Sequence, residues 1–155
     1  MTRPELNALY TKLAVLHGTW EGGEQLAPSP WMPGGKAHGR MTFRPAADGK
    51  IVVQDYEQTG NGRATFQLHG VFTLDPENGE VLWYGFDSFG FPPPDPARGG
   101  WSGDTLTLLK RTPRGAARHT LALGGDQLTY RIENQPPEGS DWHEFLSGEY
   151  ARQPE

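Results

Sequence analysis

The sequence predicts a single all-β domain over residues 1–155, a closed up-and-down antiparallel barrel of about ten strands with one N-terminal α-helix. Three observations predict it. Apolar and polar residues alternate in short segments along most of the chain after residue 18. Glycine, proline, asparagine and aspartate gather between those segments, as they do in hairpin turns. The length suits one domain, and closing the sheet removes the edges that short strands would otherwise expose.

The N-terminal segment carries the signals of a helix. Thr2-Arg3-Pro4-Glu5 has the spacing of a capping box, with proline in the first turn, where its missing N–H costs nothing. Four leucines and a tyrosine then recur at three- and four-residue spacing, and Gly18 provides a stop. We expect the helix over about residues 3–16 and the barrel over about residues 18–152.

Segments with the pattern of strands follow the helix, and turn residues separate them. Two connections, residues 27–36 and 89–97, are longer and rich in proline. Strand patterning resumes on both sides of each connection, so neither is a linker between domains. The expected strands cover residues 19–26, 37–45, 50–59, 63–74, 80–88, 98–102, 104–111, 116–123, 126–134 and 142–152.

Composition excludes several classes of partner. The formal net charge is −5 and no run of lysine or arginine exceeds two residues, whereas nucleic acid and anionic membranes need a basic surface. The absence of cysteine excludes disulfides and thiolate chemistry. The N-terminus lacks the apolar core of a signal peptide and no segment is long enough for a membrane span, so we expect a cytoplasmic protein. The five histidines lie apart, and no metal site is expected.

Gly18-Thr19-Trp20 begins the first expected strand, and Arg152 ends the last. A Gly-x-Trp motif paired with a basic residue near the end of the last strand resembles the calycins, which include the lipocalins and the fatty-acid-binding proteins. The resemblance implies that Trp20 closes one end of the barrel and that Arg152 packs across it. A cation over an indole face is favourable by roughly 0.5–2 kcal/mol.

Further stretches are similar to a bacterial family of calycin-like domains of unknown function. They are residues 39–43, 51–57, 69–75 and 83–90. The resemblance covers about residues 6–90, then weakens, and it implies a fold but no activity.

The chain also resembles, more distantly, the nitrobindins, which are haem-binding barrels that open with Gly-Thr-Trp and hold iron through a histidine near the C-terminus. His143 occupies a comparable place before Arg152. That resemblance implies haem, held by His143, as an alternative to the expectation of no cofactor. The residues after Gly-Thr-Trp and the two long loops depart from the nitrobindin pattern.

Alternation also predicts which polar residues face the barrel interior. Glu24, Asp87, His119 and Glu144 each share their phase with apolar neighbours on the same strand. Asp55 and Glu57 share the phase of Ile51 and Val53. Tyr56 has the opposite phase, but we count it among the expected cavity residues because the barrel wall beside Asp55 can turn either way. A β-bulge or a position at a strand end would instead leave such residues in solvent. The residues expected to converge on one cavity are Trp20, Glu24, Tyr56, Trp83, Asp87, His119 and Glu144.

A barrel of this size has room for one ligand, so the expected function is to bind a small apolar or amphipathic molecule. The haem alternative uses His143. A third alternative is a small barrel enzyme that uses His119 with a carboxylate, although nothing in the spacing demands it. A fourth is a protein-interaction module. Trp31, between prolines, predicts a lid or the contact of a homodimer.

Overall fold

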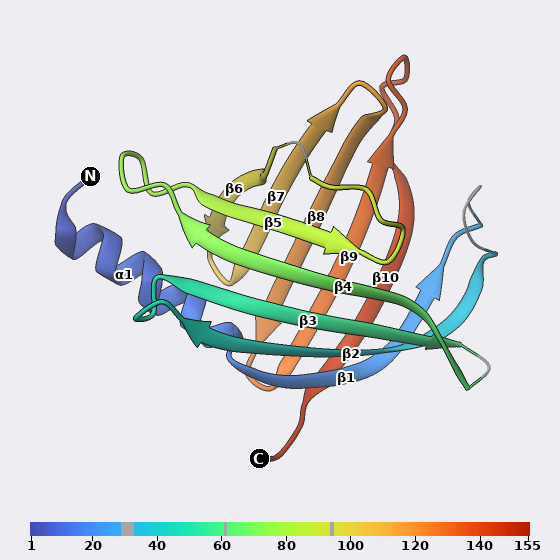
Figure 1. Ribbon diagram of the computed structural model, residues 1–155, viewed down its shortest axis with the longest axis horizontal. Coiled ribbons are helices and arrows are strands. Elements are labelled where there is room, and N and C mark those ends of the chain that lie inside the picture. The colour runs from blue at the N-terminus through green and yellow to red at the C-terminus, as the bar shows by residue number, and fades with distance from the viewer. Residues whose placement is uncertain (29–32, 61, 94) are drawn as a thin grey trace.

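Within residues 1–28, 33–60, 62–93 and 95–155, which the structure describes, ten antiparallel strands form a closed barrel (Figure 1). In this computed structural model each strand pairs with its neighbours in sequence, and the first pairs with the last. The bounds are β1 Gly18–Leu26, β2 Gly35–Ala46, β3 Ile51–Gly60, β4 Arg63–Leu74, β5 Val81–Asp87, β6 Ala97–Ser102, β7 Thr105–Thr112, β8 Gly115–Gly124, β9 Gln127–Gln135 and β10 His143–Arg152. The predicted up-and-down barrel is confirmed, and the strand edges differ from the expected ones by two residues at most.

The predicted helix is also present. It consists of α1 (Arg3–Leu13) and a following 3-10 turn, η1 (Ala14–Leu16). The Glu5 backbone N–H donates to Thr2 Oγ1 at 3.2 Å, and the Thr2 N–H donates to the Glu5 carboxylate at 2.8 Å. The capping box therefore begins the helix as expected. The helices that the structure describes include none with the length and hydropathy to cross a bilayer.

The helix lies against one end of the barrel (Figure 1). Leu13 and Leu16 are buried there, in the same core cluster as Trp20 and Phe43. Because η1 leads directly into β1, this is the end at which β1 begins and β10 finishes. The first residues of β10 and the last residues of β5 consequently lie at the opposite end, away from α1.

Two strands face the interior in a phase that alternation did not predict. On β3 the buried polar side chains are Gln54 and Gln58, whereas Asp55 and Glu57 are exposed. The strand opens with three consecutive apolar residues, 51–53, so neither phase is marked there. Asp55 bonds instead to His69 on the outer wall, 2.7 Å away.

On β10 the register with β9 shifts between Glu144 and Leu146, which marks a β-bulge at Phe145. The bulge reverses the phase of the residues before it. Leu146 faces inward, and Glu144 is exposed and pairs with Arg131 at 3.2 Å. The expectation that Glu144 would face the cavity is wrong for this reason.

Candidate functional site

The barrel encloses a cavity of about 250 Å³. Its walls are largely aromatic and aliphatic, with contributions from Tyr56, Phe66 and Trp83. Asp87, Lys110 and other lining residues come from the strand ends remote from α1. The cavity therefore extends to the barrel end opposite the helix.

His119 lies in the cavity wall on β8, and only 8% of its surface is exposed. Its Nδ1 is 2.7 Å from the hydroxyl of Tyr130 on β9, which also lines the cavity. Burial, with a smaller contribution from the charge of Lys110, lowers the pKa of His119 to about 4. Burial, and then the charge of Glu24, raise the pKa of Tyr130 above its usual range. At neutral pH both side chains are therefore uncharged.

Trp83 on β5 packs against the His119 ring, with ring centroids 4.9 Å apart and an angle of 47°. Its indole Nε1–H donates to Gln54 Oε1 at 3.0 Å. Gly70 on β4 makes this bond possible, because a Cβ there would lie 2.5 Å from both Gln54 Oε1 and Trp83 Nε1. The indole is thus held in one orientation, with its ring at the cavity wall.

Glu24 on β1 is buried, with 3% of its surface exposed, behind three residues that line the cavity. The Tyr56 hydroxyl donates to it at 2.7 Å, Gln58 Nε2 donates at 3.1 Å, and the Tyr150 hydroxyl donates as well. All three partners are donors, which suits an ionised carboxylate, a group that only accepts. Gly39 on β2 leaves the space that this cluster needs, since a Cβ there would collide with the Glu24 carboxylate.

The cavity rim carries opposite charges. Asp87 ends β5, and Lys110 lies near the end of β7. Burial lowers the pKa of Lys110, while the charge of Asp87 acts in the opposite direction. Phe89, beyond β5, is exposed and packs on Phe66, with ring centroids 5.1 Å apart. The rim therefore combines an apolar edge with one acidic and one basic side chain.

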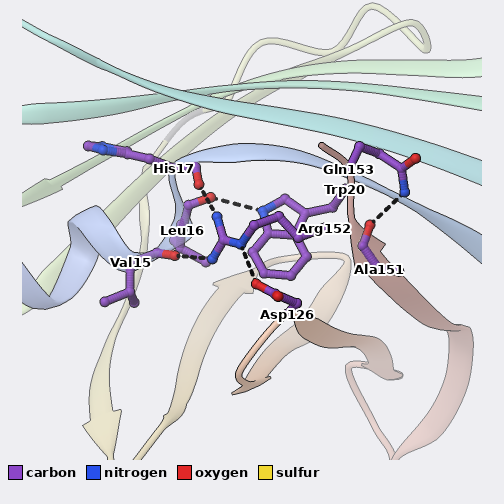
Figure 2. A network of polar contacts seen from close by, with 8 residues as sticks. All are labelled: Val15, Leu16, His17, Trp20, Asp126, Ala151, Arg152 and Gln153. Atoms are coloured by element: carbon purple, nitrogen blue, oxygen red, sulfur yellow. Dashed lines mark hydrogen bonds and ion pairs between the residues drawn. The ribbon is translucent and has the colours of Figure 1, made fainter. Parts of the chain in front are cut away.

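The other end of the barrel is sealed by Trp20, which is fully buried (Figure 2). Its indole N–H donates to the Leu16 carbonyl at 2.9 Å. Arg152 crosses the ring and donates to the carbonyls of Val15 and His17. Trp20 was expected to contact the ligand, but it does not line the cavity. It closes this end of the barrel instead.

The structure brings together four of the seven residues expected in the cavity, namely Tyr56, Trp83, Asp87 and His119. Glu24 lies behind the wall, Trp20 at the closed end and Glu144 outside. The enzyme alternative paired His119 with a carboxylate, but among the described residues the one hydrogen bond of its ring is to Tyr130.

His143 is exposed, does not line the cavity, and borders a neighbouring surface hollow instead. Trp31 lies outside the described residues. The described residues contain no group of three or more histidine, aspartate or glutamate side chains placed to hold a metal ion.

Sequence reasoning missed six polar residues of the site. Tyr130 shares the phase of Leu128 and Ile132 on β9, so its inward orientation could have been predicted from the sequence. Gln54 and Gln58 share the phase of Tyr56, and choosing that phase for β3 would have found them. The six are Gln54, Gln58, Lys110, Tyr130, Asn134 and Tyr150.

Comparisons with known proteins show the fold and no more. No protein-family model matches the chain, and no curated protein matches its sequence. The solved structure of Rv2717c from M. tuberculosis is similar with a TM-score of 0.72 and 16% identity, covering 94% of this chain and 98% of that one. An S-type phycobiliprotein lyase, CPES from Guillardia theta, is similar with a TM-score of 0.66 and 10% identity, over 97% and 93%. These neighbours share the overall fold of this chain.

Proposed function

We propose that this protein binds one small, mostly apolar molecule with an aromatic part inside the barrel. The observation that carries the proposal is the cavity of about 250 Å³ whose aromatic wall includes Trp83, held in place by its bond to Gln54. At about 30 Å³ for each water, the cavity is equivalent to about eight water molecules. That space suits a molecule of one or two rings.

The chemistry of the wall supports an aromatic ligand. Trp83, Tyr56 and Phe66 present ring surface to the cavity. Offset stacking on such rings adds about 0.5–1.5 kcal/mol to the burial of apolar area. The buried polar groups are few and fixed by their bonds, as is usual where a pocket orients its ligand. One structural neighbour is named a lyase of phycobiliproteins, and at 10% identity it supports the barrel shape alone.

Two measurements test the proposal. Native mass spectrometry of protein purified from its own host is expected to show a retained small molecule by its added mass. Calorimetric titration with 2-methylnaphthalene and related apolar probes is expected to give micromolar binding that Trp83→Ala weakens at least about tenfold, since the stacking surface is lost.

The matched control is Trp142→Ala. Trp142 lies on the outer wall, where the Arg118 guanidinium covers its ring at 4.2 Å, and it does not line the cavity. Its removal is expected to leave probe affinity unchanged. Equal losses in the two variants, or no binding of any probe, would contradict the proposal.

A further inference from the structure

We infer that the cavity selects an uncharged planar ligand that presents a carbonyl-type oxygen to His119, and that it disfavours carboxylates of the same shape. The inference rests on the proposed function and narrows it to a ligand class. It follows from the hydrogen bonding of His119 and from the place of Glu24.

The first step is the tautomer of His119. Tyr130 keeps its proton, and among the described residues the hydrogen bond of its hydroxyl is to His119 Nδ1. A phenol that keeps its proton donates it where an acceptor is present, so Nδ1 is the acceptor. A neutral imidazole has a single N–H, which then lies on Nε2. The ring therefore offers a fixed N–H donor that no protein group among the described residues uses.

The second step is the charge behind the wall. Glu24 lies directly behind Tyr56 and Tyr150, whose hydroxyls bond to it. Its charge also acts on Tyr130 on another strand, where it contributes to the raised pKa of the phenol. The deep part of the cavity is consequently at negative potential, and a ligand anion placed there is repelled.

The third step is the location of positive charge. Of the described residues that line the cavity, Lys110 is the one cation. It lies at the rim and is opposed by Asp87. Its charge reaches His119, where it is the smaller cause of the lowered pKa, but Asp87 opposes that charge at the rim. The hydrogen-bond partners of Glu24 among the described residues are all uncharged. A carbonyl oxygen satisfies the His119 N–H without bringing a net charge, whereas a carboxylate satisfies it at an electrostatic penalty. A ligand cation finds the Glu24 oxygens already occupied by three donors.

The test compares three probes with the same ring system: 2-naphthamide, 2-naphthoate and 2-methylnaphthalene. Calorimetry at pH 7 is expected to show 2-naphthamide binding at least about tenfold tighter than 2-naphthoate, or about 1.4 kcal/mol. It is also expected to bind more tightly than 2-methylnaphthalene, which has no acceptor for His119.

Glu24→Gln is expected to reduce the difference in affinity between 2-naphthamide and 2-naphthoate, because the buried charge is removed. Glu144→Gln is the matched control, since Glu144 is exposed on the outer wall, and it should leave the ratio unchanged. Where Glu24→Gln fails to fold, Tyr130→Phe provides a second measurement. Without the phenol proton Nδ1 can carry the hydrogen, so the advantage of the amide over 2-methylnaphthalene should shrink.

Equal or tighter binding of 2-naphthoate would overturn the inference, as would an amide no tighter than 2-methylnaphthalene. In both cases the proposed function stands, because an apolar probe still binds. If none of the three probes binds, the inference and the proposed function fail together.

Discussion

The guanidinium of Arg152 lies 4.2 Å from the ring centroid of Trp20 and joins the last strand of the barrel to the first. Backbone pairing places the two residues opposite each other, and Arg152 also bonds to Asp126 at 3.1 Å. One side chain therefore ties together β1, β10, the end of the helical segment and the turn before β9 (Figure 2). The latch expected from the calycin resemblance is present.

Arg152→Ala is expected to lower the free energy of unfolding by about 1–3 kcal/mol, because it removes both the ring contact and the hydrogen bonds to backbone carbonyls. Arg152→Lys keeps the charge but loses the planar fork, so it should recover part of the loss. Urea denaturation of the three proteins measures this. An unchanged midpoint in Arg152→Ala would show that the latch does not stabilise the fold.

The helical segment is expected to be part of the fold and not an appendage. Leu16 is fully buried against the barrel end, and Leu16→Ala should cost about 2–5 kcal/mol. Deletion of residues 1–16 should expose the apolar surface beneath them and cause aggregation, visible by size-exclusion chromatography. A truncated protein that stays monomeric with native stability would refute this role.

Stability should fall as pH is lowered through the range set by His119. Its pKa is about 4 in the folded protein and near 6.5 when exposed, so the unfolded chain binds a proton that the native state does not. The contribution of neutral His119 to the free energy of unfolding is fully present above pH 6.5. It is lost as pH falls from 6.5 to about 4, and the loss amounts to about 3 kcal/mol.

The measurement is the difference in unfolding free energy between the wild type and His119→Gln from pH 7 to pH 4. Taking the difference removes the titration of other groups. A difference that does not change with pH would show that His119 is not held neutral by burial.

Haem makes a separate prediction through His143. If the protein is a haem protein of that kind, added hemin gives a Soret band that His143→Ala abolishes and His119→Ala leaves. With the ligand beside His119, we expect no band that depends on His143. A His143-dependent band would favour the haem alternative over the proposed function.

The strands could be predicted because their limits depend on local chemistry. Turns such as Ala47-Asp48-Gly49 need left-handed backbone, and all three of these residues have positive φ. The helix likewise depended on a capping box within four residues. Such signals survive without knowledge of the tertiary structure.

The interior of the cavity depended on long-range pairing, and this could not be read from the sequence. The phase of β10 changes at a bulge that exists only in its pairing with β9, and it moved Glu144 outside. Glu24 bonds to Tyr150 across a separation of 126 residues, which follows from closure of the barrel between β1 and β10. The alternation of apolar and polar residues along one strand indicates neither the bulge in β10 nor the pairing of β1 with β10.

The central claim, a ligand beside Trp83, is tested most directly by following tryptophan indole N–H signals in ¹⁵N-labelled protein by NMR during titration with 2-naphthamide. The indole N–H of Trp83 bonds to Gln54 in the cavity wall, whereas that of Trp20 bonds to Leu16 at the closed end. Substitution of each tryptophan by phenylalanine assigns the signals. We predict a saturable shift of the Trp83 signal with the Trp20 signal unchanged. A Trp83 signal that stays fixed while signals of tryptophans outside the cavity move would contradict the account.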